Sequence, residues 1–278
     1  MTTTLRPTGP LQQNSDGARA RAYEICVNSR HVGVLELASD TQFGPSVGVV
    51  RGLAVDGPDR RRGRATVAAL AAEEVLRSWG CTRVRASVPA GAEGAHRLVT
   101  ALGYRELSRN MVKELVPGPR PLPPGAAARP IAPAEYEDWS EAARAGFAQD
   151  WVDRGMTPEA ARAKSDASHA ELLPRGLDTP GTWIRILEAD GERAGQVWVA
   201  AREVAPGRPG AYVFDVEVPA GQRGRGHGRT LMLLAEGVAL EAGAELLGLH
   251  VFAGNAPALG LYASLGYVTT ERHYGKDL

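Results

Sequence analysis

The sequence predicts an α/β protein made of two related halves, each a central sheet flanked by helices. Three observations support this prediction. The chain repeats itself at a fixed offset of 163 residues, and a proline-rich segment separates the two repeats. Each repeat also has the order strand, glycine-rich turn, helix, strand. Self-similarity at one spacing indicates duplicated structural units, so we expect two tandem domains.

The composition fits a globular protein of this kind. Apolar residues make up 44% of the 278 residues, enough for a core, and Lys+Arg and Asp+Glu balance at 32 each. The net charge therefore gives no general attraction to nucleic acid or an anionic membrane. Two cysteines without ligand spacing predict neither a disulfide framework nor a metal site. Since there is no apolar run of membrane-spanning length and no signal-peptide core, we expect a cytoplasmic protein without a membrane partner.

The domain boundary is predicted at 116-VPGPRPLPPGAAARP-130. Its prolines are incompatible with a helix interior or a central strand, so this segment is expected to be an extended linker. We predict a first domain over residues 1–115, a linker over 116–125 and a second domain over 126–278.

The two halves match without a gap over more than 50 residues. The correspondences are Arg60 with Arg223, Gly63 with Gly226, 88–104 with 251–267, and 109–115 with 272–278. A single offset held over this length is not expected from compositional bias. The second half is therefore interpreted as a copy of the first.

The elements of the second half follow from hydrophobic periodicity and turn residues. In chain order we expect helices at 133–148 and 158–173, strands at 183–189, 195–202 and 211–218, a helix with the apolar face Leu231, Leu234, Ala235, Val238 and Ala242, a strand at 246–252, a short helix at 256–264 and a last strand from Tyr267. The first half has no counterpart to the two leading helices. About 20 residues are expected before its first strand.

The stretch 222-QRGRGHGRT-230 connects a predicted strand to a predicted helix. Unpaired N–H groups converge at such a helix start, and glycines allow the backbone to approach an anion such as pyrophosphate. A plain basic loop remains the alternative. The P-loop and dinucleotide fingerprints are absent, and no aromatic residues are interleaved for nucleic-acid stacking.

Two motifs indicate a family. Residues 223–228 fit [QR]-x-x-G-x-[GA], and 255-NAPALGLYASLGY-267 fits N-x-x-A-x-x-L-Y-x-x-L-G-Y. Together they resemble the GNAT superfamily of acyl-CoA-dependent N-acetyltransferases over most of residues 126–278, and residues 20–115 resemble it more weakly. The resemblance implies a mixed, mostly antiparallel sheet flanked by helices in each domain. It also implies acetyl-CoA as co-substrate, without a metal.

The resemblance assigns roles to individual residues. Tyr262 is expected to protonate the departing thiolate. Val216 and Val218 are expected to contact the pantetheine arm where two strands splay apart, and Asn255 to bond the same arm. The main-chain amides of the glycine loop are expected to hold the pyrophosphate, and this loop comprises Arg223, Gly224, Arg225, Gly226, His227, Gly228 and Arg229.

The attacking amine must lose a proton, because an amine of pKa about 10 is mostly charged at neutral pH. Asp215 and Glu217 are the candidate bases. Simple alternation places both on the face opposite Phe214, whereas a bulge in this strand would break that inference. His250 is either a further site residue or a hydrogen-bonded core histidine.

Several of these residues also fit a purely structural role. Tyr262 also fits a core aromatic residue, and Asn255 fits a helix N-cap. Trp139, Asp150 and Trp151 of the leading helices either line an amine pocket or serve packing and surface exposure.

The first copy has Ala92 where the second has Asn255, and Val99 where it has Tyr262. We therefore predict that it is catalytically inactive, either a packing partner or a weak CoA binder. The predicted function is transfer of an acetyl group from acetyl-CoA to a primary amine of a small molecule or peptide, by direct attack in a ternary complex. A non-catalytic acyl-CoA sensor is the alternative, and nucleic acid is not an expected partner. We expect a monomer with an internal pseudo-dimer, or a homodimer.

Overall fold

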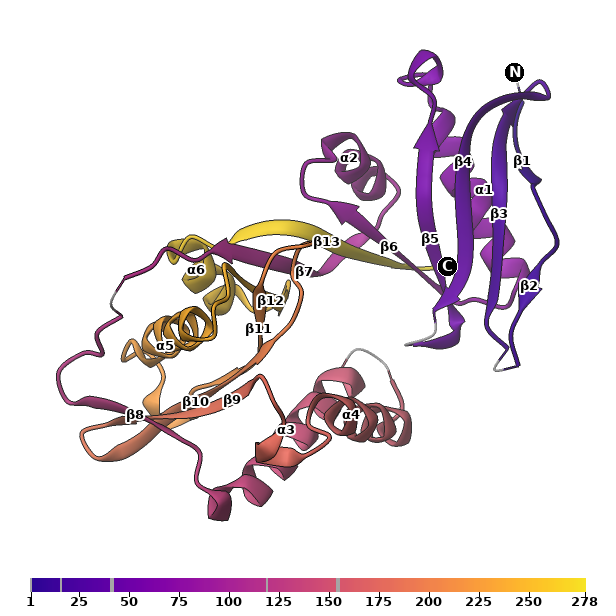
Figure 1. Ribbon diagram of the computed structural model, residues 1–278. Helices are drawn as coiled ribbons and strands as arrows, with labels where there is room; N and C mark the ends of the chain where they lie inside the picture. Colours follow the sequence, from indigo (N-terminus) through magenta and orange to yellow (C-terminus); the bar gives the residue numbers. More distant parts are fainter. Residues whose placement is uncertain (1, 16, 41–42, 119, 154–155) are drawn as a thin grey trace. The chain divides into compact units, whose positions relative to one another are not determined.

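The computed structural model describes residues 2–15, 17–40, 43–118, 120–153 and 156–278 (Figure 1). Pro119 of the predicted linker lies outside these residues. Two compact units make up the chain. Unit 1 comprises Met1–Arg109, Phe252–Gly254 and Thr269–Leu278, and unit 2 comprises Asn110–Val251 and Asn255–Val268. Because these units are defined by contacts in space, the domain boundaries along the sequence stay a prediction.

Unit 1 is a sheet with two helices. Its strands are β1 (Thr3–Pro7), β2 (Gln12–Gln13), β3 (Arg19–Val27), β4 (Arg30–Asp40), β5 (Gly44–Val55), β6 (Arg83–Pro89) and most of β13 (Val268–Asp277). Its helices are α1 (Arg64–Ser78) and α2 (Glu93–Ala101). The sheet has the order β1-β3-β4-β5-β6-β13, with β5 and β6 parallel. Ile25, Leu37 and Leu76 are fully buried in its core.

Unit 2 contains the remaining elements. They are β8 (Ala126–Pro130), α3 (Pro133–Val152), α4 (Pro158–Leu172), β9 (Thr182–Ala189), β10 (Glu192–Ala201), β11 (Gly210–Glu217), α5 (His227–Glu241), β12 (Leu246–Phe252) and α6 (Ala256–Ser264). Part of β7 (Arg105–Glu114) also belongs to unit 2, and the sheet order is β7-β12-β11-β10-β9-β8. The predicted helices and strands of the second half are confirmed, with α3 extending to Val152.

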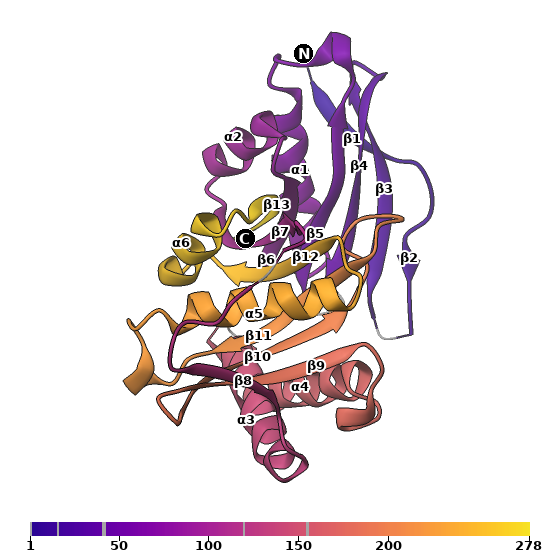
Figure 2. The ribbon, with the colours of Figure 1, turned by 60° about the vertical axis from the view of Figure 1, so that its left-hand side comes forward.

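The sheet of unit 2 is covered on both faces (Figures 1 and 2). α5 covers one face, where Leu231 and Met232 pack with Leu247 and are fully buried. α3 and α4 cover the other face over a second, largely aromatic cluster that includes Trp139 and Trp198. The site described below lies on the strands between these two layers.

The duplication predicted from the sequence is confirmed element by element. α1 and α5, β6 and β12, α2 and α6, and β7 and β13 all begin and end at positions related by the same offset. In the described part of the first copy, no helix lies between β1 and β3, whereas α3 and α4 occupy the corresponding stretch between β8 and β9. The expected absence of front helices in the first copy is therefore confirmed.

The expectation of about 20 residues before the first strand is wrong. β1 already pairs with β3, from Thr3 opposite Val27 onward, and β8 pairs with β9 in the same way. Both are short strands at a sheet edge, made mainly of small or polar residues. Backbone hydrogen bonds to one neighbouring strand can hold such a strand without the burial of many side chains. Its sequence therefore lacks the apolar alternation from which strands are predicted.

Each unit is completed by a strand from the other half of the chain. In unit 1, Lys276 of β13 places its Nζ 2.9 Å from an oxygen of Glu73 in α1. In unit 2, Lys113 of β7 places its Nζ 2.6 Å from an oxygen of Glu236 in α5. Both glutamates are buried, with 2% and 0% exposure. Each copy therefore supplies the lysine that neutralises the buried glutamate of the other copy.

Candidate active site

The glycine loop joins β11 to the start of α5. Gly224 and Gly226 have φ angles of 77° and 87°, and Gly226 is the N-cap of α5. An L-residue adopts such angles only with strain, so glycine is needed here. In the described part of the chain, the amides of residues 224–228 donate to no backbone carbonyl. Free N–H groups at a helix start, together with the helix dipole, make this loop fit a pyrophosphate.

Two arginines of the loop bond to the protein itself. Arg223 Nε donates to the carbonyl oxygen of Val218 at 3.0 Å, and Arg229 donates to Ser264 Oγ at 2.6 Å. Among the described residues, Arg225 alone of these three arginines has no hydrogen bond or ion pair. Gly228 allows close approach of α5 to α6, since a Cβ there would lie 3.3 Å from Leu261. Main-chain amides are thus the more available anion-binding groups.

The predicted divergence of two strands is present. The parallel pairing of β11 with β12 runs from Gly210 and Leu246 to Val213 and Leu249, and no pair of described residues follows. Both strands continue for several residues beyond this point. Val216 and Val218 lie in the diverging part and pack against the core beneath α5.

A β-bulge determines the direction of the candidate bases. Trp198 of β10 pairs with Asp215 and Val199 pairs with Val213, so Phe214 is the extra residue. The bulge predicted as an alternative to simple alternation is therefore confirmed. Phe214 packs into the cluster beneath α3 and α4, and Glu217 lines a cavity on that same side. Simple alternation placed Asp215 and Glu217 on the face opposite Phe214. That expectation is wrong, because the bulge brings them to the same face as Phe214.

Gln196 of β10 connects the two carboxylates. Its side chain is 4% exposed, and its Nε2 donates to Glu217 Oε2 at 2.8 Å. Its Oε1 accepts a hydrogen bond from Arg193, which fixes the orientation of the amide. Gln196 also lies near enough to Asp215 to act against the rise in that carboxyl's pKa. The sequence carries a local signal for this residue, because Gln196 is a polar residue inside an otherwise apolar strand.

The environment of Asp215 raises its pKa to about 6. Burial is the largest cause, and the negative charge of Glu217 acts in the same direction, with a smaller effect from Asp150 of α3. Hydrogen bonds from Gln196 and from the Val216 backbone partly oppose the rise. A carboxylate with this pKa is ionised at neutral pH, yet it accepts a proton more readily than an ordinary aspartate.

Tyr262 lies on α6 and is 9% exposed. Burial and the negative charge of Asp215 raise its pKa to about 12. Its ring packs against Tyr267 with centroids 5.9 Å apart, and its hydroxyl bonds to no other described residue. The residue is thus part of the core, as one reading predicted, while its phenol stays protonated and able to donate.

Asn255 is a helix N-cap, as predicted. Its Oδ1 accepts from the backbone N–H of Ala258 at 3.2 Å, at the start of α6. Its role toward the cofactor arm stays a prediction. His250 is exposed, with Nδ1 2.9 Å from Asn110 Oδ1. The interpretation of His250 as a core histidine is therefore wrong.

A cavity of about 260 Å³ lies between α3 and the β10–β11 strands. It is lined by Asp138, Trp139, Ala142, Arg193, Gly195, Gln196, Glu217 and Pro219. Trp139 is 3% exposed and also packs edge-on against Trp198, so it serves both the core and the cavity wall. Trp151 packs against Phe147. The negative charge of Asp150 contributes to the raised pKa of Asp215. Asp138 and Arg193 had no distinguishing sequence signal.

The first copy preserves the loop but lacks the chemical groups. Gly63 caps α1 with φ 73°, and Arg61 takes the left-handed angle that glycine takes in the second copy. Arg60 Nε donates to the Val55 carbonyl at 2.7 Å, which repeats the bond of the second copy. Gly52 and Ala54 stand at the positions of the two candidate bases.

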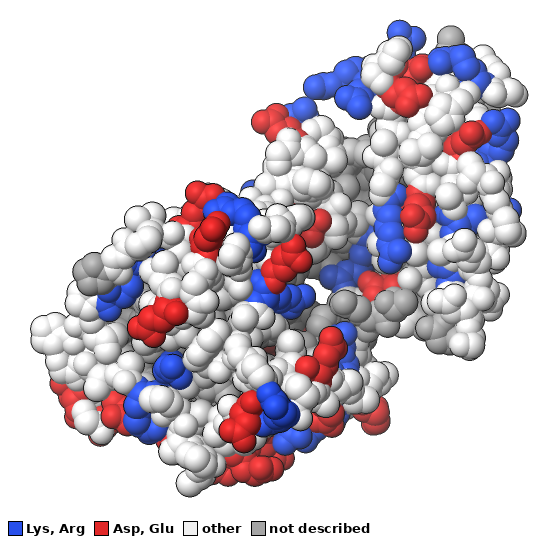
Figure 3. All heavy atoms as spheres, viewed as in Figure 1, with Lys and Arg blue, Asp and Glu red and all other residues white. Residues whose placement is uncertain are grey.

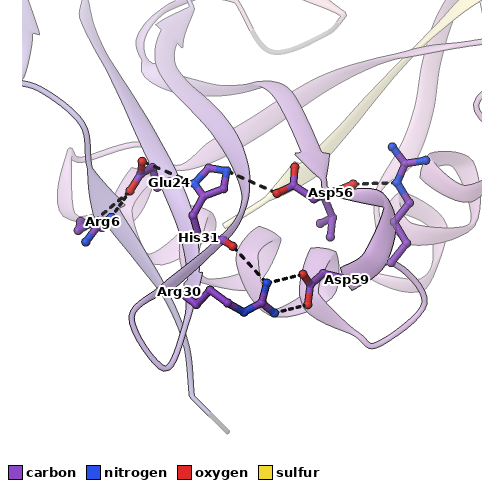
Figure 4. Close-up of polar contacts among 8 residues, drawn as sticks. Arg6, Glu24, Arg30, His31, Asp56 and Asp59 are labelled. Atoms are coloured by element: carbon purple, nitrogen blue, oxygen red, sulfur yellow. Dashed lines mark hydrogen bonds and ion pairs between the residues drawn. The ribbon is translucent and has the colours of Figure 1, made fainter.

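Polar contacts connect β4 to the segment just before the loop of the first copy (Figure 4). Asp59, which is 3% exposed, receives two hydrogen bonds from Arg30 at 2.9 and 2.7 Å. His31 lies 3.6 Å from Asp56 and 3.5 Å from Glu24. The second copy has the uncharged residues Pro219 and Gln222 at the positions of the two aspartates. Asp56 and Asp59 therefore fix the start of this loop to β4. Their negative charges would repel an anionic ligand at the loop.

Across the described ranges, no group of three or more His, Cys, Asp and Glu side chains is placed to hold a metal ion. None of the helices in the described part of the chain has both the length and the apolar character of a membrane span. On the face drawn in Figure 3, acidic and basic side chains are interspersed.

Comparison with known proteins gives consistent results. The model of the acetyltransferase (GNAT) family matches residues 4–104 and 136–267. A mycothiol acetyltransferase of Saccharomonospora viridis is 29% identical over 282 residues, covering 96% of this chain and 86% of the relative. The uncharacterized N-acetyltransferase YdgE of Bacillus subtilis is 30% identical over 146 residues, covering 52% of this chain and 92% of the relative.

Solved structures share the fold. A GCN5-related N-acetyltransferase from Sphaerobacter thermophilus has a TM-score of 0.58 at 21% identity, covering 92% of this chain and 80% of that one. A tandem GNAT protein from the clavulanic acid biosynthesis pathway has a TM-score of 0.53 at 19% identity, covering 95% and 85%. Family matches in both halves agree with the internal duplication. The chain therefore belongs to the GNAT acetyltransferase family, in a tandem form with a degenerate first copy.

Proposed function

We propose that the protein is an acetyl-CoA-dependent N-acetyltransferase whose second copy transfers the acetyl group to an amine. The observation that carries the proposal is the arrangement of Asp215 and Tyr262 beside the strand divergence and the glycine loop. The loop amides and Gly226 would bind the pyrophosphate of acetyl-CoA, and Val216 and Val218 would contact its pantetheine arm. The co-substrate supplies an acetyl group activated as a thioester.

Asp215 is the proposed base. The acceptor arrives as an ammonium ion, and the Asp215 carboxylate takes its proton directly or through water. The neutral nitrogen then attacks the thioester carbonyl, forming the amide bond as the carbon–sulfur bond breaks. A carboxylate with pKa about 6 is suited to this task, because it is ionised at neutral pH and is a stronger base than an ordinary aspartate.

Tyr262 is the proposed acid. Its hydroxyl donates a proton, or a hydrogen bond, to the sulfur that leaves. Its raised pKa keeps the phenol protonated before the reaction. A developing thiolate is a strong acceptor, so the bond strengthens in the transition state, when stabilisation increases the rate.

The acceptor is proposed to be a small-molecule or peptide amine. Relatives that match almost the whole chain are named mycothiol acetyltransferases, so a mycothiol-related amine belongs in the first acceptor panel. The first copy, without counterparts of Asp215 and Tyr262, is proposed to be inactive.

The test is release of free CoA thiol from acetyl-CoA across a panel of primary amines. We expect thiol release with at least one amine, and Tyr262→Phe should lower kcat about 100-fold, within the range of general acid catalysis. Thermal shift with acetyl-CoA controls for folding and binding. A protein that binds acetyl-CoA but releases no thiol with any amine would be the acyl-CoA sensor instead. Wild-type turnover by Tyr262→Phe at every pH would refute the acid role.

A further inference from the structure

Asp215 and Glu217 lie two residues apart on β11, but their contact with solvent differs. Glu217 is exposed, whereas the Asp215 carboxyl is largely desolvated. The negative charge of Glu217 acts on Asp215, because a like charge nearby makes a carboxyl harder to ionise. If only one of the two groups takes a proton during the reaction, the site needs a feature that separates their tasks.

The strand register brings Gln196 of β10 to both carboxylates. Its Cα is paired with that of Glu217, while Trp198, two residues further along β10, is paired with Asp215. Asp215 is therefore the diagonal neighbour of Gln196, and a long side chain reaches such a neighbour across two strands. Gln196 Nε2 donates to Glu217 Oε2 at 2.8 Å, and the same side chain acts on the Asp215 carboxyl.

Arg193 fixes the orientation of the Gln196 amide. A glutamine side chain has an acceptor oxygen and a donor NH2 group at the same end. Arg193 donates to Oε1, so the oxygen is directed toward Arg193 and the NH2 group toward the carboxylates. Gln196 is 4% exposed, so water competes little for these bonds. The reverse orientation would place the amide oxygen against a carboxylate oxygen, without a hydrogen between them.

Building on the proposed acetyl transfer, we propose that Gln196 is the positioning residue that divides the tasks of the two carboxylates. It holds Glu217 by a hydrogen bond as a charged neighbour, and Asp215 is left to take the proton of the amine. Gln196 thus acts through the carboxylates and not on the reacting atoms. Arg193 supports it by keeping the NH2 group directed toward β11.

The groups that act on Asp215 come from four elements. Glu217 shares β11 with it, Gln196 lies on β10, Asp150 on α3 and Tyr262 on α6. The charges of Glu217 and Asp150 raise the pKa of Asp215, whereas Gln196 and one backbone N–H of β11 lower it. Loss of the Gln196 donor should therefore raise this pKa, and loss of the Glu217 charge should lower it.

The experiment follows the Asp215 carboxyl by NMR in the full-length protein, labelled with 13C at the aspartate carboxyl carbons. The Asp215 resonance is the one that Asp215→Asn lacks, and its titration is recorded without acetyl-CoA. Gln196→Met should raise the midpoint by about 0.5–1 pH unit, and Glu217→Gln should lower it by about as much. The matched control is Gln149→Met, which removes an exposed amide of α3 that donates to Asp153 and should leave the midpoint unchanged.

Arg193→Met is the second test variant. It keeps Gln196 but frees the amide to turn, so it should move the midpoint in the same direction as Gln196→Met by a smaller amount. This variant decides the matter alone if Gln196→Met does not fold. A midpoint that is unchanged or lower in Arg193→Met, and in a folded Gln196→Met, would overturn the proposal.

The thiol-release assay connects the titration to the reaction. With an amine that the wild type acetylates, the acidic limb of kcat/KM should follow the NMR midpoint in the Gln196→Met and Glu217→Gln variants. A limb lost in Glu217→Gln and kept in Asp215→Asn would make Glu217 the base and overturn the division of tasks. If the wild type acetylates no amine while the midpoints move as expected, the proposed function fails, whereas the effect of Gln196 on Asp215 stands.

Discussion

At the scale of single residues, the pKa of Asp215 is raised to about 6 because the carboxyl is largely desolvated and lies near the negative charge of Glu217. If Asp215 is the base, kcat/KM should rise with pH through a limb near 6 as the carboxylate loses its proton. Asp215→Asn should lower kcat/KM at least 100-fold at pH 7 and abolish that limb. Rates measured from pH 5 to 9 test this. A limb near pH 6 that persists in the variant would assign it to another group.

The same pKa predicts an effect on stability. A carboxyl whose pKa is raised by folding is harder to ionise in the folded state than in the unfolded state. The free energy of unfolding therefore falls as the pH rises from about 4 to about 6, and it stays lower above pH 6. Asp215→Asn should therefore raise the free energy of unfolding at pH 8 by about 1–3 kcal/mol, with little gain near pH 4. Urea denaturation at both pH values checks this, and a loss of stability at pH 8 would contradict it.

At the scale of elements, α6 and α2 offer a matched pair of helix starts. The two N-cap residues have nearly the same backbone angles, φ −88° for Asn255 and −87° for Ala92, but only Asn255 has a capping side chain. Asn255→Ala should cost about 1 kcal/mol of stability, and Ala92→Asn should gain a comparable amount. Thermal denaturation measures both. A destabilising Ala92→Asn would show that the two helix starts are not equivalent.

The elements that the sequence predicts best are those with a strong local signal. The glycine loop, α5 and β12 follow from glycine positions that need positive φ and from apolar periodicity. The offset between the two copies then predicts the equivalent elements of the first copy. β1 and β8 were missed because an edge strand needs few apolar residues. The bulge at Phe214 could be named as an alternative but not chosen, since one extra residue leaves the local pattern of β11 unchanged.

Motifs in the sequence mark part of the candidate site, whereas residues that meet only through long-range contacts carry no such local mark. Tyr262 and Asn255 occur in a recognisable spacing, whereas Gln196 meets Asp215 and Glu217 only through strand pairing. The exchange of β7 and β13 was not predictable either. The two copies are similar in sequence there, so no local feature tells which copy's strand completes which unit.

At the scale of the whole molecule, strand exchange makes each unit depend on the other half of the chain. Lys276→Met should leave Glu73 buried, with Arg77 4.0 Å away as its remaining basic partner, and cost about 3–5 kcal/mol. Lys113→Met should cost less, because Arg120 stays 3.1 Å from Glu236. Denaturant unfolding of both variants measures the difference, and an equal or reversed order would contradict the role of these ion pairs.

The central claim is that the second copy alone performs the reaction. Gly226 and Gly63 cap equivalent helices with similar positive φ angles, so alanine at either position should cost about 1–2 kcal/mol. The decisive measurement is the KM for acetyl-CoA of Gly226→Ala and Gly63→Ala in the thiol-release assay. We predict a rise of at least tenfold for Gly226→Ala and none for Gly63→Ala. The opposite pattern, or equal rises, would contradict the claim.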